Sequence, residues 1–349
     1  MTAHIMLDGR RILYIAPRFF GYDDDIASEM TRRGAVVTRL LDRPFDKPLM
    51  TAVTKLAPGS IANAALPIYR NALKEAQAPF DILFVINGQT LSPTFLAELR
   101  QHSPNATLIL YLWDSLRNRA SIIPALSKYD HVFGFDRTDA TQFGFRYRPL
   151  FFAPVFEAPS VETPHYGISF IGTAHTDRAP IVHALDTVLP AEIMRFWYLF
   201  LQAPWVRRYY GLKNAAFRRV PADMFRYTPM KKDEIGRVFQ QSRAILDVEH
   251  PLQRGLTMRT FETLGARKKL ITTNPHIVEE DFYDPRNILV IDREKVRINL
   301  DFFHDSFAPT APTIRRRYAL AGWLDEILAG AGMKVDDAGA KSETITCAE

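Results

Sequence analysis

The sequence predicts an α/β protein with two Rossmann-like domains that face a cleft. The chain has 349 residues, which is long for one typical domain and sufficient for two. In each half, short apolar segments alternate with helical ones, a pattern typical of a parallel sheet covered on both faces. Prolines and aromatic residues dominate 148–164, between the two halves. This composition favours a linker between two domains.

The first domain is predicted to span residues 1–150. Its expected strands are continuous apolar runs at 11–16, 36–41, 81–86, 107–112 and 131–135. Helical segments alternate with them at 26–33, 61–76 and 93–100. Asp23 to Asp25 open the first of these helices and Gly34 ends it.

Residues 151–165 are predicted to be the linker, and 166–310 the second domain. Its expected strands are 166–171, 244–246, 270–271 and 288–291, with a helix at 257–265. An amphipathic helix within 311–330 is expected to close the fold. The polar, Gly- and Ala-rich segment 331–349 is predicted to be disordered.

Two loops of the second domain each follow a strand and precede a helix. One contains Gly172 and Thr173, and the other contains Gly255. In open α/β sheets ligands bind at the carboxyl ends of strands, where helix N-termini present free N–H groups. Arg259 would add positive charge for a phosphate, and Glu262, one turn further, could accept hydrogen bonds from a ribose diol. The alternative is an ordinary Rossmann-like helix with a surface Arg–Glu pair.

The segment 247–274 resembles the nucleotide-sugar site of GT-B glycosyltransferases. It is most similar to the CgeB-like branch, which includes lipopolysaccharide and capsule biosynthesis proteins, in Gly-Leu-Thr-Met-Arg-Thr-Phe-Glu262 and Lys-Lys-Leu-Ile-Thr-Thr-Asn274. The turn at 20–22 and the strand end at 135–136 resemble the acceptor-side domain of the same family. Many retaining members carry a Glu eight residues before the ribose Glu. Here that position is Arg254, so inverting and retaining transfer both stay open.

The resemblance implies a set of donor-binding residues around the two loops. His175 and Arg178 could meet the diphosphate, although such residues are often structural or solvated when they occur alone. The predicted donor site comprises Gly172, Thr173, His175, Arg178, Arg254, Gly255, Leu256, Thr257, Arg259, Glu262, Thr273 and Asn274.

The implied activity is transfer of a sugar from a nucleotide-diphosphate sugar to a surface polysaccharide, a lipopolysaccharide or a lipid-linked glycan. No cofactor or metal is expected, because the second half has no Asp-x-Asp at a strand end and the chain has no His-Glu-x-x-His or Cys pair. Arg254, Arg259 and Lys268 supply positive charge instead. The alternative is a non-catalytic nucleotide- or glycan-binding scaffold on the same fold.

An inverting transferase needs a base for the acceptor hydroxyl. Asp114, directly after the strand at 107–112, is the first candidate, and Asp24 is the second. Asp114 could instead cap a helix at 115–119, and Asp24 could simply suit the dipole at a helix start. Asp136 and Asp139 are predicted to be helix caps.

Composition and charge limit the classes of protein to which this chain can belong. There are 44 Lys and Arg against 39 Asp and Glu, a balance that does not indicate nucleic-acid binding. Cys347 is the only cysteine, no signal peptide is recognisable and no apolar run could span a bilayer. A cytoplasmic protein is therefore expected. Aromatics and arginines interleave in 191–220. This pattern predicts an insert packed on the sheet, a surface that contacts the inner face of the cell membrane, or a surface that stacks nucleic-acid bases.

Overall fold

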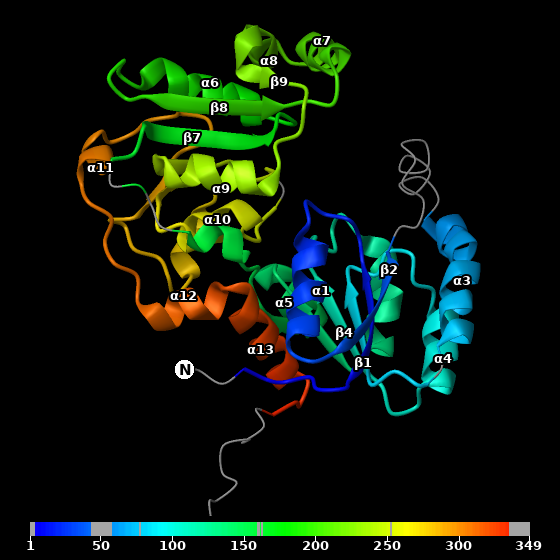
Figure 1. The fold of residues 1–349 in the computed structure, drawn as a ribbon. Coiled ribbons are helices and arrows are strands. Elements are labelled where there is room, and N and C mark those ends of the chain that lie inside the picture. Colours follow the sequence, from blue (N-terminus) through cyan, green and yellow to red (C-terminus); the bar gives the residue numbers. More distant parts are fainter. Residues whose placement is uncertain are drawn as a thin grey trace, which may run out of the picture.

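The computed structural model describes residues 4–42, 58–76, 78–158, 161, 163–251 and 253–334, and the side chains of 58–63 are not described. These residues form two six-stranded sheets in the orders β2-β1-β3-β4-β5-β6 and β12-β11-β10-β7-β8-β9. All neighbouring strands are parallel. Figure 1 shows the second sheet and its helices above the first. The predicted fold class, α/β with two Rossmann-like domains, is confirmed.

The first sheet is built from the apolar runs of the first half. Its strands are β1 (Arg11–Ala16), β2 (Val36–Leu41), β3 (Ile82–Ile86), β4 (Thr107–Leu112), β5 (His131–Gly134) and β6 (Arg146–Tyr147). The helices between them are α1 (Tyr22–Arg32), α3 (Pro58–Glu75), α4 (Pro93–His102), the 3₁₀ helix η1 (Ala120–Lys128) and α5 (Arg137–Phe143). Every residue of β3 is buried, as expected for a central strand covered on both faces.

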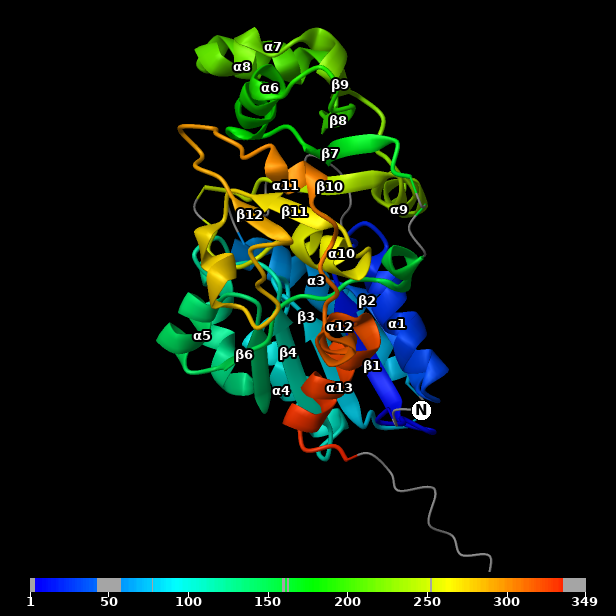
Figure 2. The ribbon, with the colours of Figure 1, turned by 90° about the vertical axis from the view of Figure 1, so that its left-hand side faces the viewer.

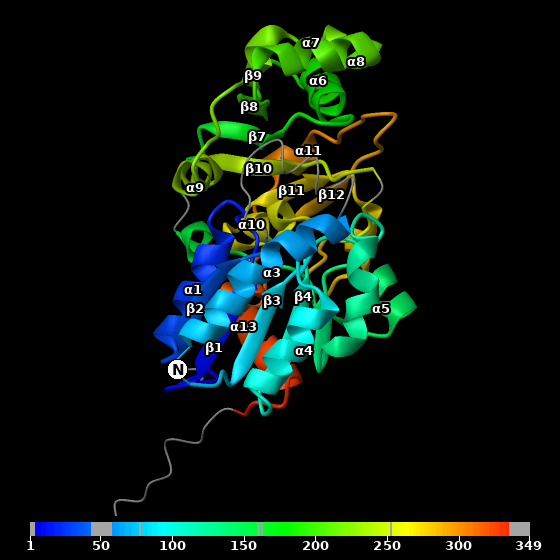
Figure 3. The same cartoon turned by 90° about the vertical axis from the view of Figure 1, so that its right-hand side faces the viewer.

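Alternating residues of β1 pack into two separate hydrophobic cores on opposite faces of the strand. Leu13 and Ile15 pack in one cluster with residues of α3 and α4, which cover one face of the sheet (Figure 3). Tyr14 packs in another cluster with Ile26 of α1 and Trp323 of the C-terminal helix. This alternation follows from the two-residue period of a strand.

The second sheet consists of β7 (Tyr166–Thr173), β8 (Arg195–Phe200), β9 (Phe225–Arg226), β10 (Ser242–Asp247), β11 (Lys269–Thr272) and β12 (Ile288–Val290). Its helices are α6 (Arg178–Val188), α7 (Pro204–Lys213), α8 (Ala215–Arg219), α9 (Lys232–Gln240), α10 (Met258–Gly265) and α11 (Asp301–His304). Short 3₁₀ turns are η3 (Ala222–Met224) and η4 (Pro275–Glu279). The reading of 191–220 as an insert missed β8, which pairs with β7 inside the sheet.

The chain passes between the domains twice. It first leaves β6 through η2 (Pro154–Glu157), and it later returns through α12 (Pro312–Tyr318) and α13 (Leu320–Gly330). Figure 2 shows α12 and α13 running from the second domain down onto the first. Phe152 and Leu320 join the two passages, because the Leu320 amide donates to the Phe152 carbonyl at 3.0 Å. Residues 159, 160 and 162 of the predicted linker and 335–349 of the predicted disordered tail lie outside the described residues.

Candidate functional site

A pocket of about 600 Å³ lies between the two domains. Its first-domain wall comes from segments that directly follow β1, β4, β5 and β6. Its second-domain wall comes from the ends of β7, β8 and β10 and the starts of α9 and α10. Both sheets therefore turn their carboxyl edges toward the pocket, the place where open α/β sheets bind ligands.

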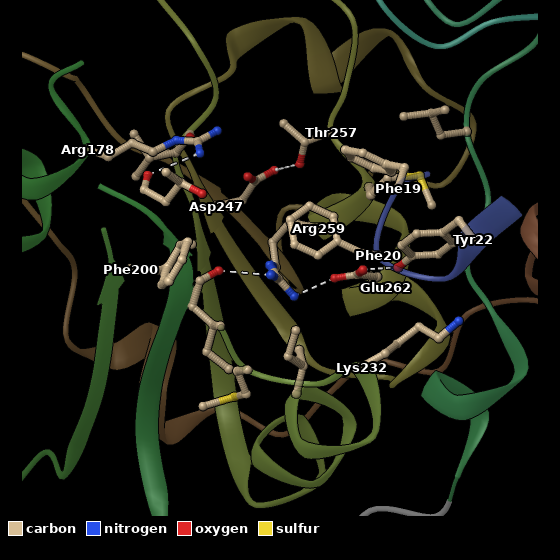
Figure 4. Close-up of a pocket in the computed structure, with 18 of the residues that line it drawn as sticks. Phe19, Phe20, Tyr22, Arg178, Phe200, Lys232, Asp247, Thr257, Arg259 and Glu262 are labelled. Carbon is tan, nitrogen blue, oxygen red and sulfur yellow. Dashed lines mark hydrogen bonds and ion pairs between the residues drawn. The ribbon is translucent and has the colours of Figure 1, made fainter. Parts of the chain in front are cut away.

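The pocket brings together several residues that the sequence analysis selected from distant segments. Those that line it are Asp114, Gly172, Thr173, Arg178, Thr257, Arg259 and Glu262. Figure 4 shows Arg178, Thr257, Arg259 and Glu262 around the same space. The pattern of strand, loop and helix start was therefore sufficient to select residues that meet in three dimensions.

Glu262 lies buried on α10, and both of its carboxylate oxygens are engaged. Oε1 accepts a hydrogen bond from the Tyr22 hydroxyl of the first domain, and Oε2 accepts one from Arg259 Nη1 (Figure 4). Burial, with the Glu262 carboxylate beside it, raises the pKa of Tyr22 well above its usual value, so the hydroxyl stays a donor at neutral pH. Because a carboxylate offers about four lone-pair positions, it retains capacity for a further donor.

Arg259 is held in place from two further sides. Its Nη2 donates to the Ile171 carbonyl at the end of β7, at 2.8 Å. Its guanidinium lies over the Phe239 ring, 4.8 Å from the ring centroid. The alternative of a surface Arg–Glu pair is therefore wrong, because the two side chains form an ordered, partly buried arrangement in the pocket wall.

Arg178 brings a second fixed cation to the pocket. Its Nε donates to the Val248 carbonyl at 2.6 Å, and its Nη1 lies 3.2 Å from His175 Nε2. No carboxylate of the described residues lies within ion-pair distance of it. Burial lowers the pKa of Arg178, but an arginine remains charged in proteins. The pocket thus has a cation whose charge is not neutralised by direct contact.

His175 supports Arg178 from behind the pocket wall and does not line the pocket. Burial, the Arg178 charge and His250 lower the pKa of His175 to about 4. The imidazole is therefore neutral near pH 7, and its nitrogen can accept a hydrogen bond from the guanidinium.

Asp114 stands on the first-domain wall of the pocket, with 39% of its side chain exposed. Its Oδ2 accepts hydrogen bonds from Arg119 Nη2 at 2.9 Å and from Asn87 Nδ2 at 3.2 Å. The described residues place no hydrogen bond on Oδ1. The arrangement leaves one carboxylate oxygen available to a group in the pocket.

The alternative reading of Asp114 as the cap of a helix at 115–119 is wrong. The chain makes a turn there, and a helix starts only at Ala120. The Asp139 carboxylate takes the groups that a cap would serve, because it accepts from the Ser115 hydroxyl at 2.9 Å and from the Leu116 amide at 2.7 Å. Asp139 is therefore not a cap of its own helix, whereas Asp136 does cap α5.

Other predicted residues lie outside the pocket. Arg254, Gly255 and Leu256 line a separate hollow of about 410 Å³ beside Arg137 and Glu280. The Gly255 amide, expected to face a phosphate, instead donates to Asp136 Oδ2 at 3.2 Å. A Cβ on Gly255 would approach the Phe135 ring to 2.5 Å, so domain packing explains the glycine.

Thr273, Asn274 and Asp24 are also placed elsewhere. The Thr273 hydroxyl donates to Glu249 Oε2 at 2.5 Å, and the Asn274 side chain caps η4. Asp24 lines a third hollow, of about 630 Å³, and pairs with Arg39 at 2.5 Å. Asp24, the second candidate for the catalytic base, therefore does not line the same pocket as Asp114.

An aromatic wall and a lysine between the domains also belong to the site, although neither was among the predicted site residues. Phe19, Phe20 and Trp113 line the first-domain side, and the Phe19 and Trp113 ring centroids are 5.2 Å apart. Lys232 Nζ on α9 contacts the Asp25 carboxylate and donates to the Gly21 carbonyl at 3.2 Å. The aromatic residues after β1 could have been recognised in the sequence as part of the site. Lys232 could not, because its contacts join two domains.

Asp247, at the end of β10, is another lining residue that was not selected. Its Oδ2 accepts from the Thr257 and Thr260 hydroxyls at 2.7 and 2.9 Å. These bonds fix the start of α10 against β10. In the part of the chain that the structure describes, no group of three His, Cys, Asp or Glu is placed to hold a metal ion. No described helix is long and apolar enough to cross a membrane.

Neither a protein-family model nor a curated protein sequence matches this chain. Solved structures do match it across most of its length. The Anabaena Alr3699/HepE structure, in complex with UDP and glucose, has a TM-score of 0.54 at 11% identity and covers 93% of this chain and 95% of that chain. A glycosyltransferase from Rickettsia africae has a TM-score of 0.54 at 10% identity, with 93% of each chain covered.

A third structure, S. aureus MnaA with UDP, has a TM-score of 0.50 at 10% identity and covers 91% of both chains. At these identities the comparisons establish the fold, which is the GT-B arrangement of two Rossmann-like domains.

Proposed function

We propose that this chain is a metal-independent GT-B glycosyltransferase that takes a nucleotide-diphosphate sugar as donor. The observation that carries the proposal is the interdomain pocket, where Arg178 and Arg259 meet the buried Glu262 carboxylate. Its volume of about 600 Å³ lies in the range of small-molecule and cofactor sites. The matching structures in complex with UDP support a nucleotide as the ligand.

The donor is assigned to the second-domain wall. Its diphosphate lies by Arg178 and the start of α6, where a cation and helix N–H groups favour negative charge. Its ribose lies by Glu262. Its base lies against the apolar and aromatic part of the wall, which includes Tyr198, Phe200 and Met230.

The acceptor is assigned to the first-domain wall, where Asp114 stands beside Trp113. In an inverting reaction the acceptor hydroxyl oxygen bonds to the anomeric carbon and the bond from that carbon to the diphosphate oxygen breaks. The hydroxyl proton passes to Asp114, and the nucleoside diphosphate leaves with the electron pair. Retaining transfer would make Asp114 a positioning group. We assign the acceptor class to surface polysaccharide, lipopolysaccharide or lipid-linked glycans of the CgeB-like branch, at the inner face of the cell membrane.

A second candidate is a nucleotide- or glycan-binding scaffold without turnover. One observation favours it: Tyr22 and Lys232 contact the opposite domain across the pocket, and Tyr22 already occupies one Glu262 oxygen. Such contacts would suit a domain pair that closes without substrate.

Thermal melting with nucleoside diphosphates, followed by assays with UDP- and GDP-sugars, tests both candidates. We expect at least one nucleoside diphosphate to raise the melting temperature, because a ligand at about 100 Kd adds roughly 2.7 kcal/mol of stability. Arg178→Met should abolish this rise, whereas Arg286→Met, at an exposed arginine, should preserve it. Binding together with release of nucleoside diphosphate supports the transferase, and binding without turnover supports the scaffold. No melting shift with any nucleotide contradicts the transferase and a nucleotide-binding scaffold, and leaves only a scaffold that binds glycans.

A further inference from the structure

Helix α7 exposes large apolar side chains at the end of the molecule away from the first domain (Figure 1). Trp205 is 67% exposed, Tyr209 45% and Leu212 83%. Their spacing of four and three residues puts them on one side of the helix. We call these three residues the α7 face. Val206 and Gly211 on the same helix are buried, so the α7 face is the side that the fold leaves open.

Packing on the sheet does not account for this face. Beyond β8, the aromatics of the segment 191–220 divide into two groups in the structure. Phe217 of α8 is buried, with its ring centroid 5.4 Å from those of Tyr210 and Phe225. These residues form the packed insert that the sequence allowed, whereas the α7 face remains in solvent.

The same segment concentrates positive charge. Residues 202–222 contain Arg207, Arg208, Lys213, Arg218 and Arg219 and no Asp or Glu. Their charge of +5 equals the formal net charge of the whole chain, so the rest of the protein is balanced.

Four of these cations are exposed, and one of the four, Lys213, contacts the Tyr209 hydroxyl. Arg207 turns inward, with its guanidinium 5.3 Å from the Phe225 ring centroid. The other four are exposed, and none of them forms an ion pair with another residue of the described ranges. We call this group the cationic cluster: Arg208, Lys213, Arg218 and Arg219.

We propose that the α7 face and the cationic cluster together form a docking surface for an anionic lipid bilayer. Trp and Tyr favour the membrane–water interface, and Leu212 can enter the boundary of the acyl chains. Exposed Lys and Arg are attracted by anionic headgroups, each by about one decade of affinity or slightly less. An aliphatic leucine as the most exposed member suits lipid better than the stacked bases of a nucleic acid.

This surface is linked to the pocket by the chain itself. Phe200 lines the pocket at the end of β8, and α7 begins only four residues later. Docking through α7 would therefore hold the donor domain of the pocket near the bilayer. This consequence rests on the proposed function, because it matters for catalysis only if the pocket takes a lipid-linked acceptor. The docking itself does not depend on catalysis.

Flotation of the full chain with vesicles tests the docking surface. We expect binding to vesicles of phosphatidylcholine with 30% phosphatidylglycerol and much weaker binding to phosphatidylcholine alone. The triple variant Arg208→Gln, Arg218→Gln, Arg219→Gln should lose roughly 100-fold or more in affinity for the anionic vesicles. The double variant Trp205→Ser, Leu212→Ser should lose at least about 10-fold. Unchanged melting temperatures verify that both variants fold.

A matched control is Val188→Ser with Met194→Ser, which removes two half-exposed apolar side chains outside the surface. It should bind vesicles as the parent does. Arg178→Met should also dock normally, even though it loses nucleotide binding, so failure of the proposed function is distinguishable. The proposal is overturned if the parent does not float with anionic vesicles, or if the control weakens binding as much as the α7 variants. Tighter binding to an oligonucleotide, lost in the same variants, would instead assign the surface to nucleic acid.

Discussion

The Glu262 carboxylate joins the two domains inside the pocket, and its partners define what its loss should do. Glu262→Ala is expected to weaken nucleoside diphosphate binding by roughly 1–3 kcal/mol, because a charged hydrogen-bond acceptor is lost. Isothermal calorimetry measures this change. Glu262→Gln is the matched variant, since it can still accept from Tyr22. Equal affinity in a folded Glu262→Ala variant would remove this residue from the ribose site.

Asp114 supports a second residue-scale prediction, now that the capping role is excluded. Asp114→Asn should preserve donor affinity and cut turnover by about 10²–10⁴-fold, because an amide cannot take the acceptor proton. Steady-state turnover and calorimetry on the same preparation separate the two effects. Asp24→Asn is the control, since that side chain is 64% exposed and lies outside the pocket. Near-normal turnover in Asp114→Asn would rule out the base.

His175 predicts a pH dependence of stability. Its folded-state pKa of about 4 lies below the ordinary value of 6.5, so between these pH values the unfolded chain binds more protons. The contribution of His175 to the free energy of unfolding is therefore complete above pH 6.5, and it is lost as the pH falls toward 4. Burial is the main cause of the lowered pKa of His175, and the neighbouring Arg178 and His250 lower it further, whereas Asp177 raises it.

Urea unfolding of the parent and of His175→Asn at pH 4.5, 5.5 and 7 measures this contribution. The free energy of unfolding of the parent, relative to that of His175→Asn, should increase as the pH rises, since Asn has no proton to bind. A difference that is constant across this range would contradict the buried, neutral imidazole.

Residues of this site were predictable from sequence where one supersecondary unit positions them. Arg259 and Glu262 follow β10 within a single strand–loop–helix unit, so local pattern was sufficient. The turn at 20–22 was noted only by resemblance. The contacts of Tyr22 and Lys232 were not predicted, because they depend on how one domain packs on the other. Gly255 was misassigned for the same reason: its amide meets Asp136 across the domain boundary.

At the scale of elements, α13 has the largest predicted effect on stability. Trp323 on this helix is fully buried, with its ring centroid 4.6 Å from that of Phe151 and 4.8 Å from that of Tyr111. Trp323→Ala should therefore destabilise the first domain by about 3–5 kcal/mol through the cavity it leaves. Trp205→Ala, at the exposed tryptophan of α7, should change stability by about 0.5 kcal/mol or less. Urea unfolding midpoints compare the two, and equal midpoints would mean that α13 is not part of the first-domain core.

The elements themselves differ in how well the sequence specifies them. Central strands such as β3 are continuous apolar runs and were predicted to within a residue or two. β8 was missed although Phe-Trp-Tyr-Leu-Phe200 is an apolar run, because the aromatics and arginines of 191–220 were interpreted together as an insert or a surface. Its polar groups are satisfied locally: Arg195 pairs with Asp186 at 2.9 Å, and the Trp197 indole donates to the same carboxylate at 2.7 Å.

At the scale of the whole molecule, the two domains are connected across the pocket by few polar contacts. Lys232 on α9 contacts the Asp25 carboxylate and the Gly21 carbonyl, and its ammonium lies 5.1 Å from the Tyr22 ring centroid. Another contact across the pocket is the hydrogen bond between Tyr22 and Glu262. Outside the pocket, Arg137 and Tyr147 of the first domain contact Glu280 of the second. A charged hydrogen bond is worth about 1.5–3 kcal/mol, which changes the ratio of two conformations by roughly 10–100-fold.

Lys232→Gln should therefore widen the distribution of distances between the domains. Spin labels at Ser28→Cys on α1 and Arg237→Cys on α9, in a Cys347→Ser background, report this distance by pulsed electron resonance, because both positions are exposed. The parent should give one narrow distribution, and Lys232→Gln a broader one with longer distances. Lys231→Gln, at the adjacent exposed lysine, should resemble the parent.

If nucleotide binds across both walls, saturating nucleoside diphosphate should narrow the Lys232→Gln distribution again, since a ligand that contacts both domains favours the closed state. A distribution in Lys232→Gln identical to that of the parent would mean that the continuous core around Phe152 and α12, and not the contacts across the pocket, sets the angle between the domains.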